Sequence, residues 1–223
     1  MTPNGRISVL LVDDHAVVRE GYRRLLERSS DIDVVGEAGD SSEAYKLASS
    51  LKPAVVVMDI SLPDVSGIET TRRLLARDPD MRVLVFSMHE EAIFAARALQ
   101  AGAAGYITKA SAPEILVDAV HAVAQGDVFL SRDIAQTLAL KNLHNDDAAL
   151  KALSAREFEI MRLLAGGHSV DTIAVKLGLS TKTVANHQSA IRQKTGAQSA
   201  LDLLRIAQHY GVVPAATDGT PGR

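Results

Sequence analysis

The feature that most constrains the fold of this 223-residue chain is a regular alternation of two hydrophobic patterns over its first 125 residues. Five short runs are apolar at nearly every position, which is typical of parallel strands buried on both faces. Between these runs, apolar residues recur at helical spacing. The alternation predicts a parallel sheet covered by helices on both faces. The strand-like runs are residues 7–12, 34–38, 54–58, 83–86 and 105–107.

The second half of the chain has a different pattern, with no strand-like runs after Gly126. Ser154 and Glu157 have the spacing of a capping box at the start of a helix. Gly178-Leu179-Ser180 has the composition of a tight turn between two further helices. By itself this turn fits a helix-turn-helix and an ordinary helical corner equally well. The expected organisation is an α/β domain over 1–126, a linker over 127–150, an all-α four-helix domain over 151–211 and a disordered tail over 212–223.

Composition excludes several function classes. The chain has no cysteine, which rules out disulfides, thiol catalysis and cysteine-bound zinc. It has no apolar stretch of 18 residues, and residues 1–6 lack the apolar segment of a secretory signal, so we expect a cytoplasmic protein without a membrane segment. Acidic residues outnumber basic ones over 1–130, and the reverse holds over 151–210. The second domain is therefore the candidate for binding nucleic acid.

Polar side chains follow four of the strand-like runs, at the sheet edge where parallel α/β proteins bind ligands. Asp13 and Asp14 follow the first run, Asp59 the third, Ser87 the fourth and Lys109 the fifth. In a sheet of order 2-1-3-4-5 the three carboxylates converge, and their mutual repulsion requires a cation. Oxygen ligands without histidine suit Mg²⁺. These groups are the parts needed to place a phosphoryl group on a carboxylate.

Residues 7–125 resemble the receiver domain of two-component response regulators, an α/β flavodoxin-like fold with a five-stranded parallel sheet. The resemblance lies in the segments VLLVDD (9–14), VVVMDISLPDVSGIE (55–69), VLVFSMH (83–89) and AGYITKA (104–110). It implies that Asp59 is the phospho-acceptor and that a sensor histidine kinase is the phosphoryl donor. It also implies a Mg²⁺ ion held by Asp13, Asp14, Asp59 and the backbone carbonyl of Ser61.

The same resemblance assigns roles to residues of the last two strands. Ser87 and Lys109 are expected to contact the phosphoryl oxygens, and Tyr106 is the aromatic switch residue that turns inward when Ser87 moves. Lys109 is followed by Ala110 where many receivers have proline, so a cis peptide at this point stays open. His89, two residues beyond Ser87, is expected to face solvent, with an effect on phosphoryl hydrolysis as the alternative.

Residues 153–208 resemble the LuxR-type four-helix DNA-binding domain, which places the whole chain in the NarL/FixJ class of response regulators. The resemblance implies that the exposed face of residues 181–194 binds DNA. On that face Asn186 can pair with adenine and Ala185 can contact a thymine methyl group, which predicts a preference for A·T pairs. Candidates for phosphate contacts are Lys182, Thr183, His187, Arg192 and Lys194, and positions facing base edges are Ala185, Asn186 and Ser189.

Together these features predict a transcriptional response regulator that is not an enzyme. Phosphorylation of Asp59 is expected to release the recognition helix from occlusion through the linker, so that a homodimer binds double-stranded DNA at two half-sites. RNA polymerase is a further candidate partner. Three alternatives remain. The first is an aspartyl-phosphate phosphatase, which is disfavoured because such enzymes have a second aspartate where this chain has Ser61. The others are a regulator independent of phosphorylation and a receiver whose helical half contacts a protein instead of DNA.

Overall fold

The computed structural model describes residues 5–111, 113–141, 150, 152–210 and 212–213. The chain divides into two compact units, residues 1–145 and residues 146–223. Much of the predicted linker (142–149) and most of the predicted tail (214–223) lie outside the described residues. Within the described part of the chain, no helix has the length and apolar character needed to span a bilayer.

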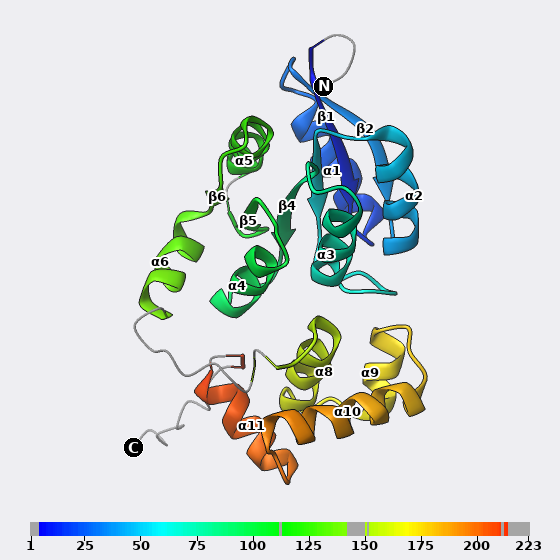
Figure 1. Ribbon diagram of the computed structural model, residues 1–223, viewed down its shortest axis with the longest axis vertical. Coiled ribbons are helices and arrows are strands. Elements are labelled where there is room, and N and C mark those ends of the chain that lie inside the picture. The colour runs from blue at the N-terminus through cyan, green and yellow to red at the C-terminus, as the bar shows by residue number, and fades with distance from the viewer. Residues whose placement is uncertain (1–4, 112, 142–149, 151, 211, 214–223) are drawn as a thin grey trace, which may run out of the picture. The chain divides into compact units, whose positions relative to one another are not determined.

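The first unit is built on a parallel sheet with the strand order β2-β1-β3-β4-β5-β6 (Figure 1). The order confirms the predicted arrangement, in which β1 and β3 are neighbours. The predicted strand count is wrong, because the sheet has six strands instead of five. The strands are β1 (Ile7–Val12), β2 (Ile32–Ala38), β3 (Val55–Met58), β4 (Arg82–Ser87), β5 (Gly105–Thr108) and β6 (Phe129–Leu130).

The additional strand, β6, lies at the start of the segment predicted to be a linker. It pairs in parallel with β5, with Phe129 opposite Gly105 and Leu130 opposite Tyr106. A run of two residues carries no measurable periodicity, so only pairing with a neighbouring strand can define it. The helix that follows, α6 (Arg132–Lys141), packs against α4 (Ala92–Gln100). The first unit therefore extends beyond the predicted end of its domain.

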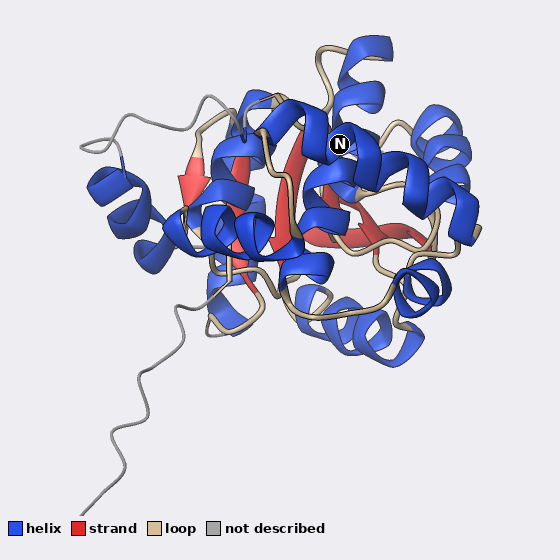
Figure 2. Ribbon diagram, turned by 90° about the horizontal axis from the view of Figure 1, so that it is seen from below, coloured by secondary structure: helices blue, strands red, loops and turns tan. Residues whose placement is uncertain are grey.

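Helices lie on both sides of the sheet, and each side has its own apolar core (Figure 2). Alternate residues of β1 enter the two cores: Val9 and Leu11 enter one, and Leu10 and Val12 enter the other. Each such fully buried side chain stabilises the fold by about 1.5–3 kcal/mol relative to exposure. The remaining helices of this unit are α1 (Ala16–Leu26), α2 (Ser41–Leu51), α3 (Gly67–Arg77) and α5 (Pro113–Gln125).

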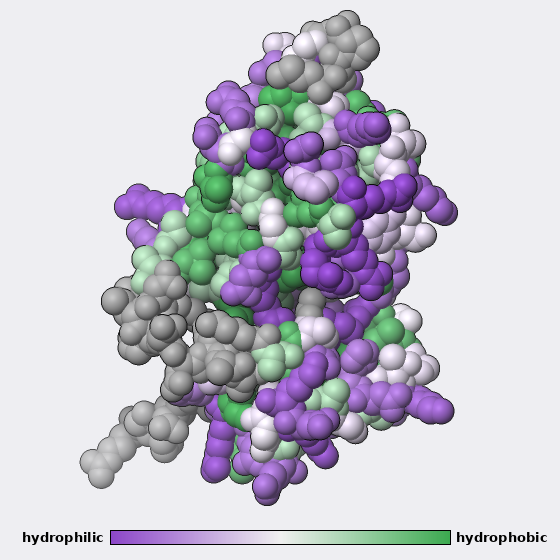
Figure 3. Space-filling model, in the orientation of Figure 1, coloured by the Kyte–Doolittle hydropathy of each residue, from purple (hydrophilic) through white to green (hydrophobic). Residues whose placement is uncertain are grey.

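Part of the surface of the first unit is apolar. Figure 3 shows green, hydrophobic side chains gathered around β6 and the start of α6. Val128, directly before β6, is 69% exposed. The short sixth strand therefore lies beside a hydrophobic region of the surface.

The second unit consists of four helices in its described part: α8 (Ala155–Ala165), α9 (Val170–Lys176), α10 (Thr181–Thr195) and α11 (Ala200–His209). Each begins after a serine whose hydroxyl accepts a backbone N–H of the first turn, which satisfies one otherwise unpaired donor. The predicted capping box of Ser154 and Glu157 is confirmed. α10 ends at Gly196, which has a φ of 75° that favours glycine.

Candidate functional site

The carboxyl ends of β1, β3 and β5 bring three predicted site residues together. The Lys109 ammonium donates hydrogen bonds to Asp13 Oδ2 at 2.5 Å and to Asp59 Oδ2 at 2.9 Å. All three side chains are less than a tenth exposed. The backbone N–H of Asp59 donates to the carbonyl of Val12, so the pairing of β1 with β3 fixes the separation of the two carboxylates. We call this cluster, together with Asp14, the acidic pocket.

Asp59 is the most constrained carboxylate of the acidic pocket. Burial raises its pKa above the ordinary value, although the charge and hydrogen bond of Lys109 act in the opposite direction. Its second oxygen, Oδ1, is buried and has no hydrogen-bond partner among the described residues. One oxygen of Asp59 is thus held by Lys109, while the other is left to accept a cation or to attack an electrophile.

Asp14 lies at the exposed rim of the pocket beside His15. His15 Nδ1 is 2.6 Å from Asp14 Oδ1 and 3.3 Å from Asp13 Oδ1. Candidate ligand atoms of Asp13, Asp14 and His15 all lie within 4.8 Å of one another. Carboxylate oxygens at this spacing fit a divalent ion such as Mg²⁺. The sequence analysis predicted the two aspartates and missed His15, although its place directly after them was a signal.

The loops after β3 and β4 meet at His89. Its ring Nε2 lies 3.3 Å from the Ser61 hydroxyl, and the ring stacks on Phe94 with centroids 4.0 Å apart. The side chain is buried, so the expectation that His89 faces solvent is wrong. The stacking partner, Phe94, lies nearby in sequence on α4, whereas the contact with Ser61 joins loops far apart in the chain, which no local pattern indicates. The Lys109–Ala110 peptide is trans.

Ser87 and Tyr106 lie on neighbouring strands β4 and β5, and both are fully buried. Ser87 Oγ accepts the backbone N–H of His89 at 3.3 Å, and the Tyr106 hydroxyl donates to the His89 carbonyl at 2.7 Å. Burial raises the pKa of Tyr106, so its hydroxyl remains a donor. The structure therefore has Tyr106 in an inward position, linked to Ser87 through one residue.

Arg19 on α1 is a site residue that the sequence analysis missed. Its guanidinium donates to the backbone carbonyl of Asp13 and also pairs with Glu37 on β2, at 3.3 Å. Arg23, one turn later, donates to the same glutamate at 2.9 Å. Arg19 thus ties the start of the acidic pocket to the next strand. Its position four residues after His15, one helical turn along α1, was the available signal.

The second unit contains the predicted helix-turn-helix. α9 and α10 pack against each other across the Gly178 turn, with Ile173 and Val184 fully buried between them and their neighbours. Gly178 has a φ of 61°, which favours glycine. α10 also packs against α8. One face of α10 is therefore buried and the other is free to contact a ligand.

The residues predicted to bind DNA differ in exposure. Thr183 and His187 are partly buried, and Thr183 is engaged with Ser180 at the start of α10. The ammonium of Lys194 donates to both carboxylate oxygens of the buried Glu157, at 2.8 and 2.6 Å. Lys194, a candidate for a DNA phosphate contact, thus also joins α10 to α8. The exposed members of the predicted set are Lys182, Ala185, Asn186, Ser189, Arg192 and Lys194.

Lys194→Ala is expected to destabilise the second unit by about 1–2 kcal/mol, because the buried Glu157 loses its cation. Burial by itself raises the pKa of Glu157, but its bonds to Lys194 and Ser154 lower it overall. Urea unfolding followed by circular dichroism measures the effect. Arg192→Ala, on the exposed face of the same helix, is the matched control and is expected to leave stability unchanged within about 0.5 kcal/mol. Equal stability of the two variants would contradict a structural role for Lys194.

Two family descriptions match this chain. "Response regulator receiver domain" matches residues 9–121, and "Bacterial regulatory proteins, luxR family" matches residues 151–207. The chain is also similar over most of its length to the response regulator GacA of Pseudomonas aeruginosa. The two sequences are 42% identical over 213 residues, which cover 95% of this chain and 100% of GacA.

Solved structures match each part of the chain. A two-component response regulator of the LuxR family from Aurantimonas sp. is 47% identical, covers 62% of this chain and 99% of its own, and has a TM-score of 0.61. A structure of two RcsB dimers bound to two parallel DNAs is 28% identical, with a TM-score of 0.58. It covers 90% of this chain and 96% of its own.

Proposed function

Because this chain belongs to the two-component response regulators with a luxR-type DNA-binding domain, we propose that phosphorylation of Asp59 controls its binding to DNA. The observation that carries the proposal is the state of the Asp59 carboxylate: Oδ2 is held by Lys109, and the buried Oδ1 has no partner among the described residues. An oxygen in this state is available to attack phosphorus. We further propose that the protein is a regulator and not an enzyme, acting in the cytoplasm, where the chromosome is accessible.

The phosphoryl transfer is a displacement at phosphorus. Asp59 Oδ1 forms the new oxygen–phosphorus bond while the nitrogen–phosphorus bond of a phosphohistidine on the sensor kinase breaks, and the proton required by the leaving imidazole comes from solvent. Lys109 is close enough to compensate the new negative charge. Asp13, Asp14, Asp59 and the backbone carbonyl of Ser61 would hold Mg²⁺, which would neutralise charge on the phosphoryl oxygens.

A series of hydrogen bonds connects the surroundings of Asp59 to the last strand of the sheet and to α6. Ser87 and Lys109 would contact the phosphoryl oxygens, and Tyr106 is linked to Ser87 through His89. The carbonyl of Tyr106 in turn accepts the backbone N–H of Ser131, and the Thr108 hydroxyl lies 3.3 Å from Asp133 Oδ2. These bonds support transmission from β5 to α6, which leads into the segment before the second unit.

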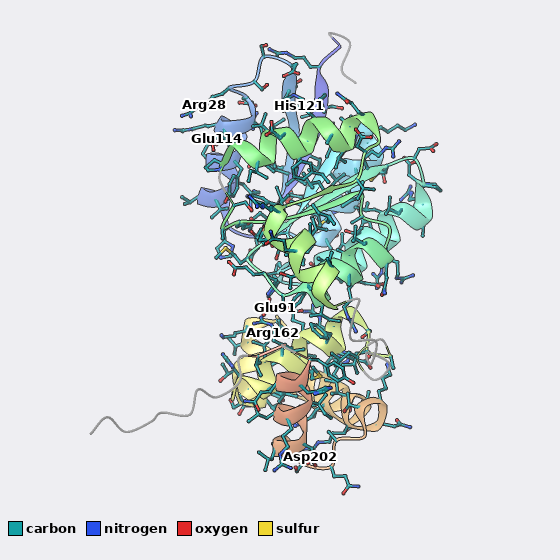
Figure 4. The ribbon with its side chains drawn as sticks, turned by 90° about the vertical axis from the view of Figure 1, so that its left-hand side faces the viewer. Arg28, Glu91, Glu114, His121, Arg162 and Asp202 are labelled. Atoms are coloured by element: carbon teal, nitrogen blue, oxygen red, sulfur yellow. The ribbon has the colours of Figure 1, made fainter. Side chains whose placement is uncertain are left out.

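The kinase is proposed to bind beside the acidic pocket, on α1. A groove of about 540 Å³ runs between α1 and the start of α5, with Arg28 and Glu114 among its lining residues (Figure 4). Tyr22 lines both this groove and the small cavity beside Asp59. Val17, at the start of α1, is an apolar side chain that is 87% exposed. A partner covering Val17 would therefore also cover the groove that shares Tyr22 with the cavity beside Asp59.

The exposed face of α10 is the proposed DNA-reading surface. Lys182 and Arg192 would contact phosphates, while Asn186 and Ala185 would face adenine and thymine. The similarity to RcsB, whose dimers are described on DNA, supports binding of a homodimer to two half-sites. RNA polymerase is a further candidate partner at such a site. We expect each half-site to favour A·T pairs, and a selection that returns only G-rich half-sites would contradict this reading.

The test is selection from randomised DNA duplexes, with and without acetyl phosphate and Mg²⁺, for the wild type and Asp59→Asn. Enrichment of a two-half-site sequence that requires the phosphoryl donor and is lost in Asp59→Asn supports the proposal. Equal enrichment in every condition would show that the receiver responds to another input. If no sequence is enriched, the proposed DNA-reading surface is contradicted, and the alternative that the helical unit contacts a protein gains support.

A further inference from the structure

The loop between β3 and α3, residues 60–66, directly follows the phospho-acceptor in the chain. Its base is closed by the carbonyl of Ile60, which accepts the backbone N–H of Gly67 at 2.9 Å. At its tip, the Asp64 carboxylate accepts the backbone N–H of Ser41 at 3.0 Å and the Ser41 hydroxyl at 2.5 Å. The loop is therefore held both at its base and at its tip.

The contact at the tip joins the loop to the start of α2, because Ser41 is the first residue of that helix. Ser41 is buried, and it lies 23 residues before Asp64 in the chain. A carboxylate in this position accepts an otherwise unpaired N–H group and interacts favourably with the helix dipole. Partial burial acts to raise the pKa of Asp64, but the two bonds from Ser41 lower it overall. The contact is therefore a charge-assisted one with two points of attachment.

The segment that contains Ser41, residues 38–41, also contacts the end of β1. The carbonyl of Ala38, the last residue of β2, accepts the backbone N–H of Asp13 at 3.0 Å. Ser41 follows three residues later and binds the loop of the phospho-acceptor. One short segment is thus bonded both to the backbone of Asp13 and to the loop that contains Ser61.

We propose that Asp64 and Ser41 form a positioning pair, which holds the loop of the phospho-acceptor at the separation from β1 that phosphoryl transfer requires. The pair acts through Ser61, three residues before Asp64, whose carbonyl is a Mg²⁺ ligand in the proposed function. Hydrogen bonds that orient metal ligands are worth about tenfold or more in affinity, so a loosened loop binds the ion more weakly. The inference rests on the proposed function, because it concerns the same transfer to Asp59.

The contact also admits a purely structural role, as a cap that stabilises α2. Asp40 provides the comparison, because its carboxylate caps the same helix by accepting the backbone N–H of Glu43 at 2.8 Å. Removal of either aspartate takes away one negative charge and one cap of α2, but only removal of Asp64 releases the loop. A cap affects stability alone, whereas a positioning residue also changes the Mg²⁺ dependence of phosphorylation.

The experiment measures the rate of phosphorylation by acetyl phosphate over a range of Mg²⁺ concentrations, by intact-protein mass, and measures Mg²⁺ binding directly by calorimetry. We expect Asp64→Ala to raise both the Mg²⁺ concentration for half-maximal rate and the dissociation constant by about tenfold. The rate at saturating Mg²⁺ is expected to be retained. Asp64→Asn is expected to stay close to the wild type, because its amide oxygen can accept the Ser41 N–H while its amide nitrogen donates to the Ser41 hydroxyl. Asp40→Ala is expected to match the wild type in both measurements.

Two further measurements make the test independent of activity and of the folding of one variant. In metal-free protein, Asp64→Ala is expected to speed amide hydrogen exchange over residues 60–66, and Asp40→Ala is not. Ser41→Ala removes only the hydroxyl bond and is expected to raise the half-maximal Mg²⁺ concentration by about threefold. This variant takes the place of Asp64→Ala if the latter does not fold.

Each other outcome has a definite meaning. If the wild type is phosphorylated and Asp64→Ala has the same Mg²⁺ dependence, the positioning pair is rejected and the proposed function stands. Equal changes in Asp64→Ala and Asp64→Asn would show an effect of charge, and equal changes in Asp64→Ala and Asp40→Ala would show damage to the start of α2. Either result also rejects the pair. If the wild type is not phosphorylated at any Mg²⁺ concentration, the proposed function fails and the inference fails with it.

Discussion

Gly67→Ala is expected to destabilise the receiver strongly and to abolish phosphorylation of Asp59. A Cβ atom at residue 67 would lie 1.8 Å from the backbone oxygen of Asp59 and 3.0 Å from the Cα of Ile60. These are backbone atoms that cannot rotate away. The Asp59 N–H is bonded to Val12 and the Gly67 N–H to the carbonyl of Ile60, so the loop is held from both sides. Either α3 or the loop that carries the phospho-acceptor has to shift.

The expected cost of Gly67→Ala is at the upper end of the range for overpacking, about 3 kcal/mol. Urea unfolding measures the stability, and intact-protein mass after incubation with acetyl phosphate and Mg²⁺ measures phosphorylation. Gly21→Ala on α1 is the matched control, because a Cβ there meets no other atom within 4 Å. Alanine is also the better helix former, so the control is expected to be more stable by up to about 1 kcal/mol. Wild-type stability and phosphorylation in Gly67→Ala would refute the close approach.

Lys109→Met is expected to cost about 3–5 kcal/mol at neutral pH, because it leaves two buried carboxylates without their common cation. The change preserves the length and apolar stem of the side chain while removing the ammonium that bonds to Asp13 and Asp59. It is also expected to abolish any response of DNA binding to acetyl phosphate. Lys46→Met, at an exposed position of α2, removes the same charge from the surface and is expected to be neutral within about 0.5 kcal/mol.

The deficit of Lys109→Met is expected to depend on pH in a defined direction. Burial already raises the pKa of Asp59 in the folded protein. Ionisation of this carboxyl therefore lowers the free energy of unfolding as the pH rises above the ordinary pKa of an aspartate. Without Lys109 this effect grows. The difference in free energy of unfolding between wild type and variant should therefore be largest near pH 7 and shrink toward pH 4, where Asp59 takes up a proton.

In the wild type, Lys109 keeps its charge over that range. Its pKa is raised above the ordinary value, since the carboxylates outweigh the opposing effect of burial. The contribution of Lys109 is therefore fully present below the ordinary lysine value and is lost only as the pH rises through the raised pKa. The double variant Lys109→Met/Asp59→Asn is expected to recover part of the lost stability at pH 7. A deficit that is constant with pH, or no recovery in the double variant, would show that the lysine acts through packing alone.

The sequence by itself determined the order of the first five strands and their helices, the four helices of the second unit and the positions of most of the acidic pocket. Strands buried on both faces require continuous apolar runs, and helices require apolar residues at their own period, so these patterns are visible in one dimension. Parallel strands also present their carboxyl ends at one edge, which is why Asp13, Asp59 and Lys109 could be placed together in advance. Serine caps are equally local signals.

Only the tertiary structure decided the features that depend on partners distant in the chain. β6 exists because two residues pair with β5, and its length leaves no period to detect. His89 is buried where Ser61 on the loop after β3 meets its ring, and Lys194 bonds to Glu157 on another helix. Sequence patterns report which face of an element is apolar. The partner of an individual polar group depends on how those faces are packed together, and no local pattern encodes that.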